Sequence, residues 1–179
     1  MTISESLAPH LPYLRRYARA LTGSQASGDA YVRAALTALL GRQRELAADL
    51  PPRVALYRLF HTIWAGTAGQ LDLDLSPELS RMTPEERLRS LSSAERAALL
   101  LTAVEGFSLT EAAAILDLST QEVEESIAQA QRGIEKSLAT SVLIIEDEAV
   151  IAMDLENLVQ ELGHSIAGTA ATRDDAVAI

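Results

Sequence analysis

Three N-terminal capping boxes in a row limit the fold of this chain more than any other feature of its sequence. In a capping box, a serine accepts a hydrogen bond from the backbone N–H three residues later, and the glutamate at that position bonds back to the serine's own N–H. The chain places Ser92 before Glu95, Ser108 before Glu111, and Ser119 before Glu122. Each pair marks a helix start, so we expect three helices in close succession.

The spacing of these starts predicts a helix-turn-helix. We expect helices over about 93–104, 109–116 and 120–138, with Gly106 ending the first of them. Only the three residues 117–119 separate the last two helices. A short helix, a three-residue turn and a longer helix make up the helix-turn-helix arrangement.

Apolar residues also recur at helical spacing through the first 65 residues. Three glycines mark the expected helix ends: Gly23, Gly41 and Gly66. The second helix is expected from about Gly28 to Leu40, and Pro51-Pro52 precedes the third. Aromatic residues are only 4% of the chain, which favours packed helices over a β-sandwich or barrel. We expect residues 1–65 to form a three-helix bundle.

The residue pattern of the chain changes at two further points, after residue 65 and after Thr140. Residues 66–76 are small, polar and acidic, as in a linker, and Thr83 followed by Pro84 predicts a short helix to about Leu91. After Thr140 the pattern changes again, and it predicts the order strand, helix, strand, helix. Such an order is typical of a parallel sheet.

The net charge of −10 is unevenly distributed, and its steps divide the chain at the same places. Residues 1–65 carry +4, residues 66–90 carry −2, residues 91–140 carry −5, and residues 141–179 carry −7. We therefore expect a helical bundle, a linker with a short helix, a helix-turn-helix module, and the start of an α/β domain. The predicted fold class is mainly α, with two small helical modules followed by a β-α-β-α fragment.

The second helix of the helix-turn-helix is poorly suited to DNA. A recognition helix reads base edges with its N-terminal residues, and flanking Lys and Arg hold the phosphates. That end of the helix carries Glu122, Glu124 and Glu125, while Arg132 and Lys136 lie a few turns away. Since carboxylates oppose binding to a polyanion, we expect no direct DNA binding and favour a protein partner.

The residues give no basis for an enzyme. The chain has no cysteine, and His10, His61 and His164 are widely separated, so the sequence offers neither a thiol nucleophile nor a zinc site. It also has no glycine-rich phosphate loop and no serine–histidine–aspartate arrangement. We expect no cofactor in this chain.

Glu146 and Asp147, at the end of the first predicted strand, are the sharpest chemical feature. Ligands of α/β folds bind at the carboxyl ends of the strands, and carboxylates there suit a Mg²⁺ that keeps several waters. The alternative is a solvated acidic turn that opens a helix, where the helix dipole favours negative charge.

The N-terminus lacks the basic and apolar regions of an export signal. The longest nearly apolar run, 97–104, is far shorter than the ~20 residues that a membrane span needs. We expect a cytoplasmic protein without membrane contact, and the lack of cysteine fits a reducing compartment.

Three stretches resemble known families. LAPHLPYLRRYARALTGSQASGDAYVRAALTALL with LYRLFHTIWAGT is similar to region 2 of extracytoplasmic-function sigma factors. Region 4 of the same factors resembles LSSAERAALLLTAVEGFSLTEAAAILDLSTQEVEESIAQAQRGIEKSL. The opening of a response-regulator receiver domain is similar to VLIIEDEAVIAMDLENLVQELGHSIAGTA. This order of modules is that of the PhyR family of alphaproteobacterial general stress response regulators.

The resemblance implies an anti-anti-sigma response regulator that works by sigma-factor mimicry. Its sigma-like part would sequester an anti-sigma factor, NepR in that family, through apolar grooves between the two sigma-like halves. A sensor histidine kinase would control it by phosphorylating the receiver. The sequence identifies no individual partner-binding residue, but the groove between the 28–40 helix and the 109–130 region is the first surface to consider.

The resemblance also assigns the acids. Glu146 and Asp147 match the receiver's acid pair, with Asp147 as a direct Mg²⁺ ligand and Glu146 as an indirect one, so Mg²⁺ is expected for the complete receiver. The phosphoacceptor aspartate of that family ends the third strand and is absent from this chain. Neither Asp174 nor Asp175 fits, because both lie at a predicted helix start. We expect this chain not to accept a phosphoryl group.

The alternative function is that of an extracytoplasmic-function sigma factor that binds promoter DNA and RNA polymerase. The positive charge of residues 1–65 and the helix-turn-helix favour it. Against it, the segment 65–69 lacks the basic residues with which a sigma factor contacts a promoter at this point.

Overall fold

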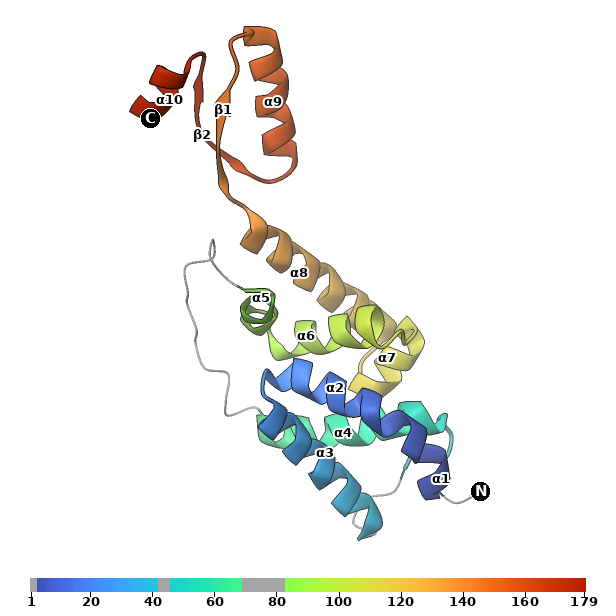
Figure 1. Ribbon diagram of the computed structural model, residues 1–179. Coiled ribbons are helices and arrows are strands. Elements are labelled where there is room, and N and C mark those ends of the chain that lie inside the picture. The colour runs from blue at the N-terminus through green and yellow to red at the C-terminus, as the bar shows by residue number, and fades with distance from the viewer. Residues whose placement is uncertain (1–2, 42–45, 69–82) are drawn as a thin grey trace. The chain divides into compact units, whose positions relative to one another are not determined.

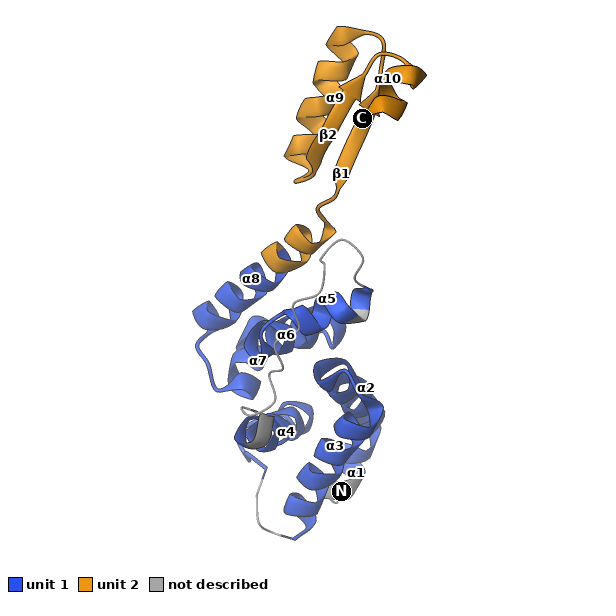
Figure 2. Ribbon diagram, turned by 90° about the vertical axis from the view of Figure 1, so that its left-hand side faces the viewer, with its two compact units in different colours: residues 1–76, 83–131 blue, residues 77–82, 132–179 orange. Residues whose placement is uncertain are grey.

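The computed structural model describes residues 3–41, 46–68 and 83–179, which form two compact units (Figure 2). The first unit extends to Gln131, and the second begins at Arg132, inside a long helix. The first unit is helical, and the second contains a two-stranded parallel sheet. The prediction of a mainly α fold followed by β-α-β-α is therefore confirmed.

The described residues before residue 69 form five helical segments (Figure 1). They are α1 (Ile3–Leu7), the 3-10 turn η1 (Ala8–His10), α2 (Leu11–Thr22), α3 (Gln25–Leu40) and α4 (Pro52–Ala68). Helices α2 and α3 pack against each other, and α4 packs against α3. Gly23 ends α2 in the left-handed conformation (φ 68°), as its position in the sequence predicts.

Two helix boundaries differ from the prediction. Helix α3 begins at Gln25 rather than near Gly28, because the Ser24 side chain accepts a hydrogen bond from the Ser27 N–H and caps the helix. Helix α4 continues through Gly66 to Ala68. A single glycine costs a helix only about 1 kcal/mol, so it does not by itself end one.

The second set of helices in the first unit begins where the capping boxes predict. They are α5 (Pro84–Ser90), α6 (Ser93–Leu99), α7 (Leu109–Leu116) and α8 (Thr120–Leu138). All three predicted boxes form, and Thr83 with Glu86 makes a fourth. The helix predicted to reach residue 104 changes at Leu100 into the π turn η3 (Leu100–Val104). Most of the predicted linker 66–76 lies outside the described residues.

An aromatic cluster joins α2 to α4 in the core of the first unit. Tyr17 of α2 packs against Tyr57, Phe60 and His61 of α4, with ring centroids 5.3–6.0 Å apart. The Tyr17 hydroxyl lies 2.5 Å from His61 Nε2. All four side chains are buried. Burial therefore lowers the pKa of His61 to about 3, so the imidazole stays neutral in the folded protein.

The second unit contains the predicted β-α-β-α order. Strand β1 (Ser141–Ile145) pairs in parallel with β2 (Ser165–Ala170), helix α9 (Ala149–Glu161) connects them, and α10 (Arg173–Ala178) follows. Ile144 is buried, whereas Leu143 and Ile145 are exposed. Among the described residues of both units, none of the helices combines the length and the apolar character that crossing a membrane requires.

Gly28 and Gly66 provide a matched test of the helix packing. A Cβ at Gly28 would lie 2.8 Å from backbone atoms of Ala18 and Arg19, whereas a Cβ at Gly66 would meet nothing within 4 Å. Gly28→Ala should lower the free energy of unfolding by about 1–3 kcal/mol, because backbone cannot move aside easily. Gly66→Ala should raise it by up to about 1 kcal/mol. Urea unfolding of both variants measures this, and equal effects would contradict the close α2–α3 packing.

His61 should make stability fall in acid. Its pKa is about 3 in the folded protein and about 6.5 when unfolded, so below pH 6.5 the unfolded state binds the extra proton. Between pH 7 and pH 5 this residue should cost about 2 kcal/mol of unfolding free energy. His61→Gln should remove that part of the loss, and the control His10→Gln should keep it. Urea unfolding at both pH values measures the difference, and an unchanged loss in His61→Gln would refute the assignment.

Candidate functional site

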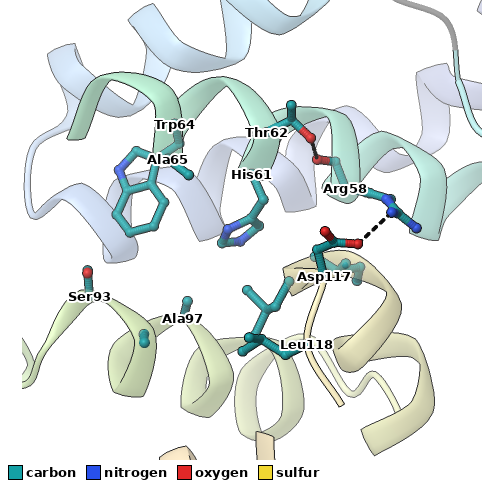
Figure 3. Close-up of a pocket in the computed structure, with 12 residues that line it drawn as sticks. Arg58, His61, Thr62, Trp64, Ala65, Ser93, Ala97, Asp117 and Leu118 are labelled. Carbon is teal, nitrogen blue, oxygen red and sulfur yellow. Dashed lines mark hydrogen bonds and ion pairs between the residues drawn. The ribbon is translucent and has the colours of Figure 1, made fainter. Parts of the chain in front are cut away.

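A cavity of about 470 Å³ lies between α4 and the helix-turn-helix segment. Helix α4 forms one wall, and α6, the end of α7 and the following turn form the other (Figure 3). Its lining is mainly apolar and includes Trp64, Ala65, Ala97, Ile115, Leu116 and Leu118. An apolar hollow between helices is the type of surface on which an amphipathic helix of another protein binds. We refer to this cavity as the α4 groove.

An ion pair closes one end of the α4 groove (Figure 3). Arg58 Nη2 of α4 lies 2.7 Å from Asp117 Oδ1. Asp117 ends α7 in the left-handed conformation (φ 59°), which aspartate adopts more readily than most residues. The two side chains are 39% and 83% exposed, so water screens the pair and its contribution is about 0–1 kcal/mol. It marks the edge of the groove rather than holding its walls together.

The position of this groove corrects the surface suggested by the sequence. The main partner of α7 is α4, whereas α3 packs on α2 and α4. The sequence alone suggests the 28–40 helix for that role. Helix α4 can pack on both sides because its buried residues run almost without a break: Val54, Ala55, Leu56, Tyr57, Leu59, Phe60 and His61.

The start of α8 presents the acidic surface that the sequence predicts. Glu122, Glu124 and Glu125 are exposed. Glu122 accepts a hydrogen bond from the Ser119 N–H (2.7 Å), and the bonds to Ser119 lower the pKa of its carboxyl group. The carboxylate is therefore held in its charged form at the end of the helix that would have to enter a DNA groove.

Part of the positive charge of residues 1–65 is paired with acids inside the first unit. Of the six arginines described there, four pair with a carboxylate: Arg15 with Asp29, Arg16 and Arg53 with Glu105, and Arg58 with Asp117. These guanidinium groups are already engaged by acids of the same unit. The +4 of the segment therefore overstates the positive charge available to a phosphate backbone.

Glu105 is a buried, multiply bonded acid that sequence reasoning missed. Its side chain is fully buried and contacts Arg16 of α2 and both Arg53 and Tyr57 of α4. Residues 91–140 contain eight acids, and the net charge alone does not distinguish Glu105 from the other seven. The available signal was its position: a single carboxylate that follows the apolar run 97–104 directly. Such a residue is rarely buried without a partner.

The receiver-like acids lie where the sequence places them, at the end of β1. Glu146 is partly exposed and Asp147 is exposed, and one Glu146 oxygen accepts a hydrogen bond from the Glu148 N–H (3.0 Å). Carboxylate oxygens are suitable Mg²⁺ donors. Within the described residues, however, no group of three or more acids or histidines could hold a metal ion. Residues Asp174 and Asp175 lie in the first turn of α10, as predicted, and not at a strand end.

Comparison with known proteins places this geometry in a family. The family model for the "Sigma2 domain of PhyR" matches residues 7–61, and the model for "Response regulator PhyR, sigma-like domain" matches residues 88–137. The phyllosphere-induced regulator PhyR of Methylorubrum extorquens is 43% identical over all of this chain, which spans 66% of that protein.

Solved structures agree in sequence and in fold. The anti-anti-sigma factor PhyR of Bartonella quintana, crystallised in complex with the anti-sigma factor NepR, is 40% identical with a TM-score of 0.82. The alignment covers 99% of this chain and 67% of that one. A structure of the PhyR stress response regulator is 52% identical with a TM-score of 0.62, covering 99% and 68%. The sigma-like helices, the receiver-like unit and their order along the sequence together show that this chain belongs to the PhyR family.

Proposed function

We propose that this chain binds an anti-sigma factor of the NepR type and, by sequestering it, releases the sigma factor that it inhibits. Its sigma-like helices would act as a mimic of the sigma factor. The observation that carries the proposal is the α4 groove: an apolar cavity between the two sigma-like halves, in whose lining Arg58 is paired with Asp117. Such a surface favours a helical protein ligand over a polyanion.

The domain limits are part of the proposal. Residues 1–65 would act as the region 2-like half, 66–90 as the linker, 91–140 as the region 4-like half, and 141–179 as the start of the receiver. The close fit of the family models to 7–61 and 88–137 supports the two sigma-like limits.

Control of this activity would come through the receiver. In the complete domain, Glu146 and Asp147 would contribute carboxylates to a Mg²⁺ site, and a sensor histidine kinase would phosphorylate an aspartate that these 179 residues do not contain. The protein would work as a cytoplasmic regulator that binds other proteins and catalyses no reaction of its own.

A charge in the α4 groove should weaken partner binding. Ala94 lines the groove on α6 and is exposed, so Ala94→Glu adds a carboxylate there without disturbing the core. With NepR of Bartonella quintana as the ligand, calorimetry should give a dissociation constant roughly tenfold or more above that of the unchanged chain.

Ala34→Glu is the matched control, because Ala34 is exposed on α3, away from the groove. This variant should bind NepR as the unchanged chain does. Wild-type affinity in Ala94→Glu would exclude the groove as the binding surface, and separate elution of the unchanged chain and NepR at micromolar concentrations would exclude the proposed function itself.

A sigma factor that binds promoter DNA is the second candidate, since Arg19 and Arg33 in the positively charged segment have no carboxylate partner among the described ion pairs. Phosphate contacts make affinity fall steeply with salt. Titration of a fluorescent promoter duplex from about 50 to 200 mM salt should show no saturable binding. A tight complex whose affinity falls by about 10³-fold over this range would replace the proposal.

A further inference from the structure

We infer that Glu105 is a positioning residue: it fixes the region 4-like helices onto the region 2-like helices and thereby sets the width of the α4 groove. The effect on partner binding rests on the proposed function, whereas the effect on the position of the helices does not. The inference follows from the contacts of one buried carboxylate.

Glu105 joins its own segment to two helices, α2 and α4, that lie far from it in the sequence. Arg16 of α2 donates to Glu105 Oε1 through Nη2 (2.8 Å) and Nε (3.3 Å). On α4, the Tyr57 hydroxyl donates to Oε2 (2.8 Å), and Arg53 Nη2 donates to the Glu105 backbone oxygen (2.6 Å). The Glu105 side chain is 0% exposed. One acid thus receives donors from both region 2-like helices that face it.

Both ends of this joint are held in place. The Glu105 N–H donates to the Leu100 carbonyl across the π turn, and Gly106 follows with a positive φ of 71°. Phe107 then packs edge-on against Tyr57, with ring centroids 4.9 Å apart, and the Arg53 guanidinium lies 4.0 Å from the Phe107 ring centroid. The hydrogen bonds and the ring contacts therefore restrain the same short segment.

The tyrosine hydroxyl is a dependable donor at this joint. Burial, and next the hydrogen bond to Glu105, raise the pKa of Tyr57 far above its usual value. The phenol therefore keeps its proton at neutral pH and remains a donor there.

These contacts of Glu105 lie on the same interface as the α4 groove, because both involve α4 and the segments around α6 and α7. Arg53 and Tyr57 precede the groove residues Arg58, His61 and Trp64 along α4. Glu105 stands between α6 and α7, which form the opposite wall. Because the segment between α6 and α7 is bonded to α4, it restrains the separation of the two walls.

The exposed Arg58–Asp117 pair alone cannot hold the two walls of the groove at a fixed separation. Its acid is 83% exposed, whereas the Glu105 side chain is fully excluded from water. Electrostatic interactions are screened in the first case and much less so in the second. The two pairs cross the same interface, and this makes Asp117 the natural control for Glu105.

The test compares Glu105→Gln with Asp117→Asn. Each change replaces a carboxylate by an amide of the same size, and Asn tolerates the left-handed conformation of residue 117. At position 105 the amide nitrogen replaces one carboxylate oxygen and cannot accept a hydrogen bond. Glutamine can therefore accept from Arg16 or from Tyr57, but not from both through separate oxygens.

The direct readout is the distance between the two halves. Because the chain has no cysteine, Ala34→Cys on α3 and Gln129→Cys on α8 introduce the only two thiols, both at exposed positions, for spin labels. The labelled chain and its Asp117→Asn variant should give one narrow distance distribution by pulsed electron resonance. The Glu105→Gln variant should give a clearly broader one while its far-ultraviolet circular dichroism shows a folded protein. A merely structural role would lower the unfolding temperature without broadening the distances.

The second readout is NepR affinity. Glu105→Gln should weaken binding roughly fivefold or more, a typical size for conformational coupling, and Asp117→Asn should leave it unchanged. If Glu105→Gln fails to fold, Tyr57→Phe removes a single donor and should broaden the distances less.

An unchanged distance distribution in the folded Glu105→Gln variant, or in Tyr57→Phe if that variant has to be used, overturns the inference. If the distances broaden but the unchanged chain does not bind NepR, the proposed function fails and the positioning role stands.

Discussion

The first unit depends on a carboxylate that has been removed from water. Burying a charge is costly unless it is paired and hydrogen-bonded, and removing one partner of a buried pair costs about 3–5 kcal/mol. Glu105 satisfies this requirement with Arg16 of α2 and with Arg53 and Tyr57 of α4. A hydrophobic contact in its place would tolerate sliding of one helix over another. Three directed donors on a single acid do not allow such sliding. This interaction therefore fixes the relative position of the helices as well as contributing to stability.

The same interaction changes the electrostatics of the surface. Each arginine that pairs with an internal acid is less available to a phosphate, and Arg16, Arg53 and Arg58 all pair across the two sigma-like halves. The start of α8 meanwhile presents carboxylates to solvent. In its described residues the unit therefore keeps helices of a sigma-like type, while four of its arginines are already paired with acids. The internal ion pairs and the acidic start of α8 both make the unit less suited to DNA. This is consistent with a protein ligand in the α4 groove.

The groove also explains why α4 differs from its neighbours. Helix α2 buries one clear face, as a helix on the outside of a bundle does. Helix α4 has buried residues at nearly every position from 54 to 61, because it packs on the bundle and on the helix-turn-helix segment at once. It thus supplies core residues such as Phe60 and groove residues such as Trp64 from a single helix. A change in the packing of α4 would therefore affect both the core and the groove.

The sequence by itself determined the helix starts, the change to β-α-β-α after Thr140, the acidic start of α8 and the family resemblance. These are local properties: a capping box needs four consecutive residues, and a hydrophobic period needs one element. The exceptions are the start of α3, where Ser24 caps the helix earlier than expected, and the end of α4, because a glycine signals a helix end only weakly. Tertiary structure alone decided which helix faces α7 and what surrounds Glu105. Its partners lie 48 and 89 residues away, and only folding brings donors at that separation around one carboxylate.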